Sequence, residues 1–560
     1  MHLSDMTVDL PERDTAIADA QALLERFRAA SSVDEQWTVL RELDAMDRQL
    51  ATLDSLTYIR FSQDTADTSA KAHRTFMDEL SPAVDVHLVD LRRAVLASPH
   101  LAVLTERLGE HTIARWRADA MSFSEAVAAD QATESALVME YMGLMASVRV
   151  DWEGESKSLG EMREVMGRPD RATRQRAAEL RDAALAAKAP EMDVLFSKLT
   201  SLRHSMALKL EQSSYTPIGY AQMGRTDYTE QDAAVYRQQV LDHVVPLCTA
   251  IRKRRAKALG IAWSDYRVWD ESIADPAGVP RPKGDHDWML AQASKMFSKL
   301  GDDFSAFFET MTSQGLLDLK SREGKAGGGY CTALYDHKVP FIFANFNGTQ
   351  DDVNVFTHEC GHAFQKVKSL HHEVIQDIRP TAESAEMHSM SLEHLCYPHM
   401  ELFFGDDADR YRTQHLEGAL LFLPYGCAID EFQHAVYENP EWTAEQRNAH
   451  WLTLEAKYLP WRHNGDLANA NTGRAWQAQR HVYFRPFYYI DYCLAETVAL
   501  QFWQLAEADR TEAMRLYREL CSLGGTKAFQ GLVAQVGLKS PLQPGTLQSI
   551  ATDVAGALGL

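Results

Sequence analysis

The residues with the clearest potential for chemistry lie within residues 355–364, which read Val-Phe-Thr-His-Glu-Cys-Gly-His-Ala-Phe. On a helix, residues four apart lie on one face, so His358 and His362 can point at a single metal ion. Glu359 is rotated by about 100° from His358 and would lie beside such a metal, where it could hold a water molecule and take its proton. Taken alone this pattern is a weak signal, but it is typical of metal-dependent hydrolysis.

The alternative is a surface helix that carries two exposed imidazoles and a solvated glutamate. The flanks at 355–356 and 363–364 are apolar, which indicates a buried helix, and buried His or Glu side chains need partners. Gly361 lies in the middle of this helix, where glycine costs about 1 kcal/mol relative to alanine. We therefore expect another element to pack closely against the helix backbone at Gly361.

A catalytic zinc takes three protein ligands, so a third ligand must come from a second element. Residues 379–394 read Arg-Pro-Thr-Ala-Glu-Ser-Ala-Glu-Met-His-Ser-Met-Ser-Leu-Glu-His, with a helix start at the Pro-Thr pair. Glu386 and Glu393 are seven residues apart and share a face, on which Glu383 also falls. Packing alone hardly explains an inward face with several carboxylates. One of them can bind a metal while another accepts a proton from a ligating imidazole. The alternative is an acidic surface face, which the apolar residues of the same segment argue against.

Residues 317–347 are the clearest candidate for β-structure. Residues 341–346 have strand propensity, and Pro340 stands at the start of that run, where a strand tolerates proline. The glycines at 327–329 allow the backbone to approach another backbone or a ligand. A loose hairpin explains these glycines equally well.

A second group of polar side chains lies in residues 481–496, which predict a loop followed by a helix. Tyr488 or Tyr489 can share a helix face with Tyr492, at spacings of four and three. Peptide hydrolysis needs donors aimed at the oxygen that becomes negative in the tetrahedral intermediate, and phenol and imidazole groups can serve. From periodicity alone, an aromatic face packed into the core is the better-supported alternative.

Composition and charge exclude several classes of protein. A chain of 560 residues is too long for one ordinary core, so two or more lobes are expected. The formal net charge of −22 argues against a nucleic-acid partner. No apolar stretch reaches the ~18 residues of a membrane span, and the N-terminus lacks the pattern of a signal peptide. The seven cysteines include no Cys-x-x-Cys, which favours free thiols in a reducing compartment, so we expect a cytoplasmic location.

The first 200 residues are helical in pattern, with an expected interruption at Ser81-Pro82 and a short break at 153–156. Gly, Pro and Tyr become frequent at 215–228, which indicates a change of organisation. We therefore predict an N-terminal helical lobe over residues 1–205 and a catalytic domain over residues 206–560.

The chain resembles the M3 family of zinc metallopeptidases, and more closely its oligoendopeptidase F branch with the shorter Pz-peptidase-like members. The likeness rests on residues 325–365, with Gly-Gly-Gly-Tyr-Cys, Pro-Phe-Ile-Phe-Ala-Asn-Phe-Asn-Gly-Thr and His-Glu-Cys-Gly-His-Ala-Phe, and extends from about residue 215 to the C-terminus. It implies a mainly α-helical, two-lobed body around a deep central channel, with a small β-sheet beside the active-site helix. Such a channel would admit short peptides and exclude folded proteins.

The resemblance also implies a metal centre. It makes His358, His362 and Glu386 the ligands of one Zn²⁺ per chain, with Glu383 as second choice for the third ligand. Glu393 would be the carboxylate that supports a ligating histidine.

Roles for the remaining site residues follow from the same resemblance. Glu359 would activate water, and three side chains would stabilise the transition state: His481, Tyr489 and Tyr492. Substrate would be bound by Gly328, Gly329, Tyr330 and Tyr488. The interval between His481 and Tyr492 leaves the choice between Tyr488 and Tyr489 open.

We therefore predict a zinc-dependent endopeptidase that cuts short unstructured oligopeptides, with a homo-oligomer possible. A zinc carboxypeptidase or dipeptidyl carboxypeptidase of related fold is the alternative within peptidases. A di-iron carboxylate protein could use the pairs Glu359/His362 and Glu431/His434, but it explains neither His358 nor the glycines. A peptide-binding scaffold without catalytic activity is a further alternative, but it would not need the full set of catalytic residue types that this sequence contains.

Overall fold

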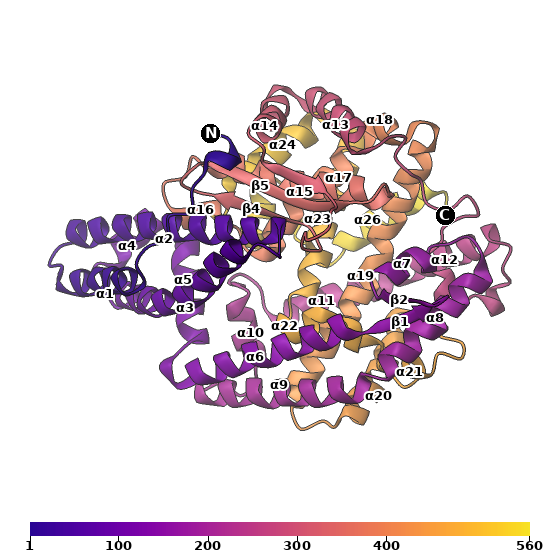
Figure 1. Ribbon diagram of the computed structural model, residues 1–560, viewed down its shortest axis with the longest axis horizontal. Coiled ribbons are helices and arrows are strands. Elements are labelled where there is room, and N and C mark those ends of the chain that lie inside the picture. The colour runs from indigo at the N-terminus through magenta and orange to yellow at the C-terminus, as the bar shows by residue number, and fades with distance from the viewer.

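The computed structural model describes residues 1–560, and the first third of the chain is helical as its amphipathic pattern predicts. Helices α1 to α5 form the indigo block at the left of Figure 1, α6 and α9 run along the lower part of the molecule, and α7 and α8 lie at its right. Their bounds are α1 (Arg13–Ala29), α2 (Val33–Gln63), α3 (Thr68–Leu96), α4 (Leu101–Leu108), α5 (Glu110–Ser122), α6 (Glu125–Ser147), α7 (Glu161–Met166), α8 (Arg171–Ala186) and α9 (Ala189–Lys209).

The expected interruption at Ser81-Pro82 is wrong, because α3 runs through Pro82 without a break. Leu80 and Val84 on either side of the proline are fully buried, and they anchor the helix in the core of the N-terminal block. Tertiary packing of a long helix can thus outweigh the cost of an internal proline, which is about 3 kcal/mol.

The break at 153–156 is in fact the turn of a short antiparallel hairpin that the sequence reading missed. Strand β1 (Arg149–Trp152) pairs with β2 (Glu155–Ser158). Glu153 and Gly154 between them have φ of 56° and 87°. Positive φ at both central residues is the requirement of a type I′ hairpin turn. Strands of four residues are too short to give a clear alternation in the sequence.

The rest of the chain forms a larger helical body. Its helices are α10 (Thr216–Gln222), α11 (Glu230–Gln239), α12 (Val245–Ala258), α13 (His286–Leu300), α14 (Asp302–Ser313), α15 (Gln350–Ser369), α16 (Ile375–Ile378), α17 (Ala382–Leu395), α18 (Glu401–Phe404), α19 (Ala408–Glu438), α20 (Ala444–Tyr458), α21 (Ala468–Asn471), α22 (Arg480–Phe484), α23 (Tyr489–Ala508), α24 (Arg510–Leu523), α25 (Phe529–Gln535) and α26 (Thr546–Leu558). Short 3₁₀ and π turns are η1 (Leu3–Asp5), η2 (Val240–Val244), η3 (Trp263–Asp265), η4 (Val268–Asp270), η5 (Tyr397–His399), η6 (Gly405–Asp407) and η7 (Ala475–Ala478). None of the helices combines the length and the apolar character that crossing a membrane requires.

The expected β region forms a three-stranded sheet beside α15 (Figure 1). Strand β5 (Val339–Phe346) is central, parallel to β3 (Leu317–Lys320) and antiparallel to β4 (Tyr330–Leu334). The first six residues of β5 are buried, which fits its run of apolar side chains. The chain passes from β5 through a short turn directly into α15, so the sheet fixes where that helix begins.

One hydrophobic core of 92 buried residues unites the larger body with parts of the N-terminal third, such as Tyr141 and Phe196. A separate core of 20 buried residues lies mainly among α1 to α5. The N-terminal block therefore has packing of its own, while α6 and α9 share the main core. The predicted boundary at residue 205 stays a prediction, as does the central channel.

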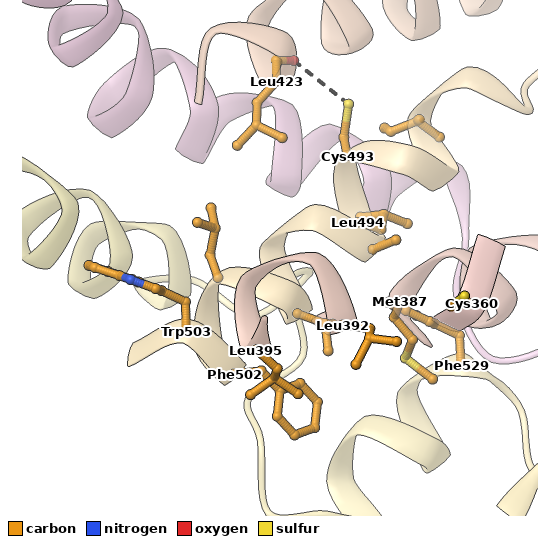
Figure 2. Packing of buried hydrophobic residues seen from close by; sticks show 14 of the residues in the cluster. Cys360, Met387, Leu392, Leu395, Leu423, Cys493, Leu494, Phe502, Trp503 and Phe529 are labelled. Carbon is orange, nitrogen blue, oxygen red and sulfur yellow. Dashed lines mark hydrogen bonds between the residues drawn. The ribbon is translucent and has the colours of Figure 1, made fainter. Parts of the chain in front are cut away.

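Helix α17 is buried within the main core and packs against α23 (Figure 2). Met387, Leu392 and Leu395 of α17 belong to the same apolar cluster as Leu494 and Phe502 of α23. The polar residues of α17 are buried as well, so its carboxylates must find partners inside the protein.

Candidate metal centre

Helix α15 is held at its start by Asp352 and along its length by aromatic packing. The Asp352 carboxylate accepts hydrogen bonds from the backbone N–H groups of Asn347 and Gly348, at 3.1 and 2.7 Å, which fixes the turn from β5 into the helix. Phe364 stacks on Phe304 of α14, with ring centroids 3.9 Å apart. The apolar face of α15 is thereby buried, and its His-Glu-x-x-His face is set toward α17.

Three side chains from α15 and α17 meet at one point. The candidate ligand atoms of His358, His362 and Glu386 all lie within 4.8 Å of one another. Oε2 of Glu386 is 3.3 Å from Nε2 of His358 and 3.5 Å from Nε2 of His362. Ligands about 2.1 Å from a tetrahedral zinc are about 3.4 Å from each other. The donor set and these spacings fit a zinc ion.

Gly361 allows the two ligand-bearing helices to approach. A Cβ atom at this position would lie 2.6 Å from Cα of Ser389 and 2.7 Å from the carbonyl oxygen of His388, both on α17. No real Cβ tolerates such contacts with backbone atoms. The expected close packing against Gly361 is confirmed.

Glu393 holds His358 in position for metal binding. Its Oε1 lies 2.7 Å from Nδ1 of His358, and its Oε2 lies 2.7 Å from Nε2 of His415 on α19. Because an ionised carboxylate only accepts, His358 carries its proton on Nδ1 and turns the lone pair of Nε2 toward Glu386. Burial alone would raise the pKa of Glu393, but the hydrogen bonds from both histidines lower it to about 2.

Glu359 lies next to this group with part of its carboxylate free. The side chain is buried, and its Oε2 has no hydrogen-bond partner in the protein. Burial raises the pKa of Glu359, and the neighbouring histidines oppose that rise. A buried polar atom without a protein partner indicates a place for water or a ligand.

The two candidates for the third metal ligand, Glu386 and Glu383, lie in different environments. Glu386 joins the histidines, whereas Glu383, one turn earlier on α17, is buried near Asp491 and Arg225. Burial and the charge of Asp491 raise the pKa of Glu383. The geometry therefore favours Glu386.

The aromatic residues near 490 form a wall beside the ligands. The hydroxyl of Tyr488 donates a hydrogen bond of 2.9 Å to Oε1 of Glu386, and its ring centroid is 4.9 Å from that of Tyr492. Tyr489 packs against Phe422 and Tyr425 of α19, at 5.5 and 5.7 Å, and its ring centroid also lies 5.1 Å from that of His481. Of the two tyrosines that the sequence left open, Tyr488 is the one that touches a candidate metal ligand.

His481 faces the same wall and presents a donor. Its ring centroid lies 5.5 Å from that of Tyr488 and 6.0 Å from that of Tyr492. Gln479 places its amide nitrogen 2.6 Å from Nδ1 of His481, while its amide oxygen accepts from Tyr425. Burial and nearby arginines lower the pKa of His481 to about 4. The ring is therefore neutral at pH 7. Because the amide nitrogen of Gln479 donates to Nδ1, the ring carries its one proton on Nε2.

The glycine segment runs alongside the metal-binding helix. A Cβ at position 329 would lie 3.3 Å from Val355 and 3.7 Å from Oε1 of Glu359, so the backbone of Gly329 lies close to the Glu359 carboxylate. Gly328 has φ of 96°, and its carbonyl accepts from the Asn345 side chain. The ring of Tyr330 stacks on Phe343 within the sheet, at 5.0 Å.

Two family models match the chain: the peptidase M3 N-terminal domain over residues 3–123, and peptidase family M3 over residues 291–552. The second range contains every site residue discussed above. A solved structure of PZ peptidase A with an inhibitor superposes with a TM-score of 0.93 at 38% identity, covering 100% of this chain and 99% of the other. The chain belongs to peptidase family M3. A second structure, provisionally assigned as an oligoendopeptidase F, gives a TM-score of 0.93 at 40% identity over 100% and 99% of the two chains.

The family models and these two structures confirm the expected M3 family, its oligoendopeptidase F branch and the mainly helical two-lobed fold. The curated relative oligoendopeptidase F, chromosomal, from Lactococcus lactis subsp. cremoris is 23% identical over 48% of this chain and 43% of its own length. The chain thus spans less than half the length of that relative in the alignment. The di-iron alternative finds no support, because Glu431 is engaged by Lys457 at 2.8 Å and is not grouped with the ligands.

Several functional neighbours in this M3 peptidase escaped the sequence reading. His415 supports Glu393 from α19, and Tyr397 lies 2.7 Å from its other ring nitrogen. Gln479 orients His481 from the residue before α22. None of them belongs to a spacing pattern, because each comes from an element whose position only the folded chain defines.

Proposed function

We propose that this chain is a zinc-dependent endopeptidase that hydrolyses internal bonds of short, unstructured peptides. The observation that carries the proposal is the spacing of His358, His362 and Glu386, with His358 fixed by Glu393. These three side chains would hold one Zn²⁺. When bound, zinc supplies Lewis acidity that activates water and polarises the scissile carbonyl.

Glu359 serves as general base and then as general acid. Its free Oε2 is placed to accept a proton from the attacking water, and its burial near the ligands keeps that carboxylate out of bulk solvent. The same carboxyl group then passes the proton to the leaving amine.

Neutral donors from α22 and α23 stabilise the oxygen that becomes negative. Nε2–H of His481 and the hydroxyls of Tyr488 and Tyr492 are the candidates, since all three rings lie together beside Glu386. In this assignment Tyr488 takes the role that the family resemblance implies for Tyr489. The role of Tyr489 stays a prediction, which the Tyr489→Phe variant tests by its turnover.

Substrate is bound in extended form along the glycine segment. Gly328 and Gly329 directly precede β4, and a Cβ on Gly329 would lie 3.7 Å from Oε1 of Glu359. An extended peptide could add to this segment by strand pairing, which reads the peptide backbone rather than its sequence. This favours peptides without a fold of their own.

We further propose a reducing, cytoplasmic setting, because all seven cysteines are free and six of them are buried.

Digestion of a peptide of about 15 residues tests the function, with fragments sized by mass spectrometry and a Glu359→Gln control. The expected result is internal cuts in the zinc-loaded enzyme, equally in a peptide whose C-terminus is amidated. Stepwise trimming of one or two residues from a free C-terminus would instead establish the carboxypeptidase or dipeptidyl carboxypeptidase. No cleavage at all would overturn the proposal.

A further inference from the structure

The turn that delivers Tyr488 to the metal ligands has an unusual residue in its centre. The backbone N–H of Tyr488 bonds to the carbonyl of Arg485 at 3.3 Å, with Pro486 and Phe487 between them. Phe487 has φ of 65°. Proline followed by a positive φ is the pattern of a type II turn, in which the third position ordinarily requires glycine or asparagine. A bulky side chain in this conformation persists only where its surroundings enforce it.

Contacts from α10, from α19 and from Arg225 in the segment after α10 enforce the conformation of Phe487. Gly219 of α10 leaves space for its ring, because a Cβ there would lie 2.6 Å from the ring. Gln433 of α19 accepts a hydrogen bond of 3.3 Å from the backbone N–H of Phe487. The ring also packs against Tyr220 at 5.4 Å.

Arg225 makes the strongest of these contacts. Its Nη2 donates to the carbonyl of Phe487 and to Oδ1 of Asp491, each at 2.5 Å, and both charged side chains are fully buried. Asp491 lies in the first turn of α23. Nη2 of Arg225 therefore links the carbonyl of Phe487, which precedes Tyr488, to Asp491 in the helix that follows Tyr488.

We propose that Arg225 is a positioning residue, which holds Phe487 in its left-handed conformation and thereby aims the Tyr488 hydroxyl at Glu386 and the reacting centre. Arg225 lies far from the metal ligands in sequence and does not contact them. Its effect on turnover passes entirely through Tyr488. This inference rests on the proposed function, because it assigns Tyr488 a role in peptide hydrolysis.

Replacing Arg225 alone would leave Asp491 as a buried unpaired carboxylate, which is strongly destabilising. The test therefore uses the double variant R225M/D491N, which removes the donor to Phe487 without stranding a charge. The matched control is R174M/D270N. Arg174 is likewise buried and likewise bridges an aspartate and a backbone carbonyl, at 2.9 Å each, but on α8.

The experiment is a cycle of four enzymes: wild type, Y488F, R225M/D491N and the triple variant, with kcat, KM and zinc content measured for each. Y488F should lower kcat by about 100-fold. R225M/D491N should lower kcat by about 10- to 100-fold at nearly unchanged KM, since small displacements of catalytic groups have effects of this size. The kcat of the triple variant should be within about 3-fold of that of Y488F, because without the Tyr488 hydroxyl Arg225 has no group left to position. In the control cycle, any loss of kcat caused by R174M/D270N should multiply with the loss caused by Y488F.

Losses that multiply in the Arg225 cycle, or wild-type kcat in R225M/D491N, would overturn the positioning role while leaving the peptidase intact. A wild-type enzyme that cuts no peptide would overturn the proposed function instead. A crystal structure of R225M/D491N gives a readout independent of activity: the distance from the Tyr488 hydroxyl to Oε1 of Glu386 should exceed hydrogen-bonding range. A distance still near 2.9 Å would contradict the inference.

Discussion

Gly361 of α15 lies directly against Ser389 of α17, so closely that a Cβ on the glycine would stand 2.6 Å from the Cα of the serine. These helices supply the two histidines and the glutamate of the candidate metal centre. The contact between Gly361 and Ser389 therefore sets the distance between the ligands of one helix and the ligand of the other.

Substituting Gly361 by alanine should disturb both stability and metal binding. The added methyl group meets backbone atoms that cannot move aside without shifting α17, and overpacking of this kind costs about 1–3 kcal/mol. We expect a lower melting temperature and less than one zinc per chain, measured by calorimetry and by metal analysis.

Gly418 provides the matched control, because it lies inside α19 and a Cβ there would meet nothing within 4 Å. Gly418→Ala should be neutral or should stabilise by up to about 1 kcal/mol through helix propensity. A Gly361→Ala protein with unchanged melting temperature and full zinc content would contradict the proposed role of the contact.

Glu393→Gln should weaken zinc binding by about 10- to 100-fold, as is usual when the partner of a ligating histidine is lost. The variant keeps the size of the side chain but no longer presents a charged acceptor to His358. Competition with a chelator measures the change in Kd. Glu496→Gln is the control, since Glu496 pairs with the buried His394 at 2.8 Å and touches no ligand. Equal effects of the two substitutions would show that Glu393 acts only on stability.

The choice between Glu386 and Glu383 can be tested by the same substitution at each position. Glu386→Gln should abolish stoichiometric zinc binding, because it removes one of the three ligands. Glu383→Gln should keep one zinc per chain, since Glu383 lies away from the histidines near Asp491. The reverse result in metal analysis would move the third ligand to Glu383.

The sequence was sufficient where chemistry depends on spacing within one helix. His358 with His362, and Glu386 with Glu393, share helix faces whatever the rest of the chain does. The same holds for Gly361, whose presence in a helix interior already signals a close neighbour. These short-range relationships predicted the motif and restricted the third ligand to the carboxylates of residues 379–394, among which the family resemblance pointed to Glu386.

Relationships between distant segments could not be predicted in this way. His415 reaches Glu393, and Arg225 reaches Phe487, only because of how α19 and the segment after α10 pack. The choice between Tyr488 and Tyr489 depends on a positive φ at Phe487, which runs against the ordinary preference of phenylalanine. The interruption expected at Pro82 is wrong for the same reason, because tertiary packing of α3 overrides a local preference.

Stability should fall in mild acid because of His111. This side chain is buried in α5, and burial together with Arg115 lowers its pKa to about 4. Between pH 6.5 and pH 4, His111 is protonated in the unfolded chain, where a histidine has a pKa near 6.5, but is neutral in the folded chain. The contribution of this residue is therefore present above pH 6.5 and falls by about 2 kcal/mol between pH 7 and pH 5.

The His111→Gln variant should accordingly lose less stability than wild type over this interval, as measured by urea unfolding at the two pH values. The same substitution at the exposed His371 serves as control and should leave the slope as in wild type. An identical slope in His111→Gln and wild type would rule out this histidine as the source.

The most direct test of the account is the Glu359→Gln enzyme, assayed for zinc content and for cleavage of an unstructured peptide. The substitution keeps the size of the side chain and leaves His358, His362 and Glu386 in place, but removes the base that takes the proton from water. The account predicts one zinc per chain and a fall in kcat of about 10²- to 10⁴-fold. Wild-type turnover in a zinc-loaded Glu359→Gln protein would contradict it.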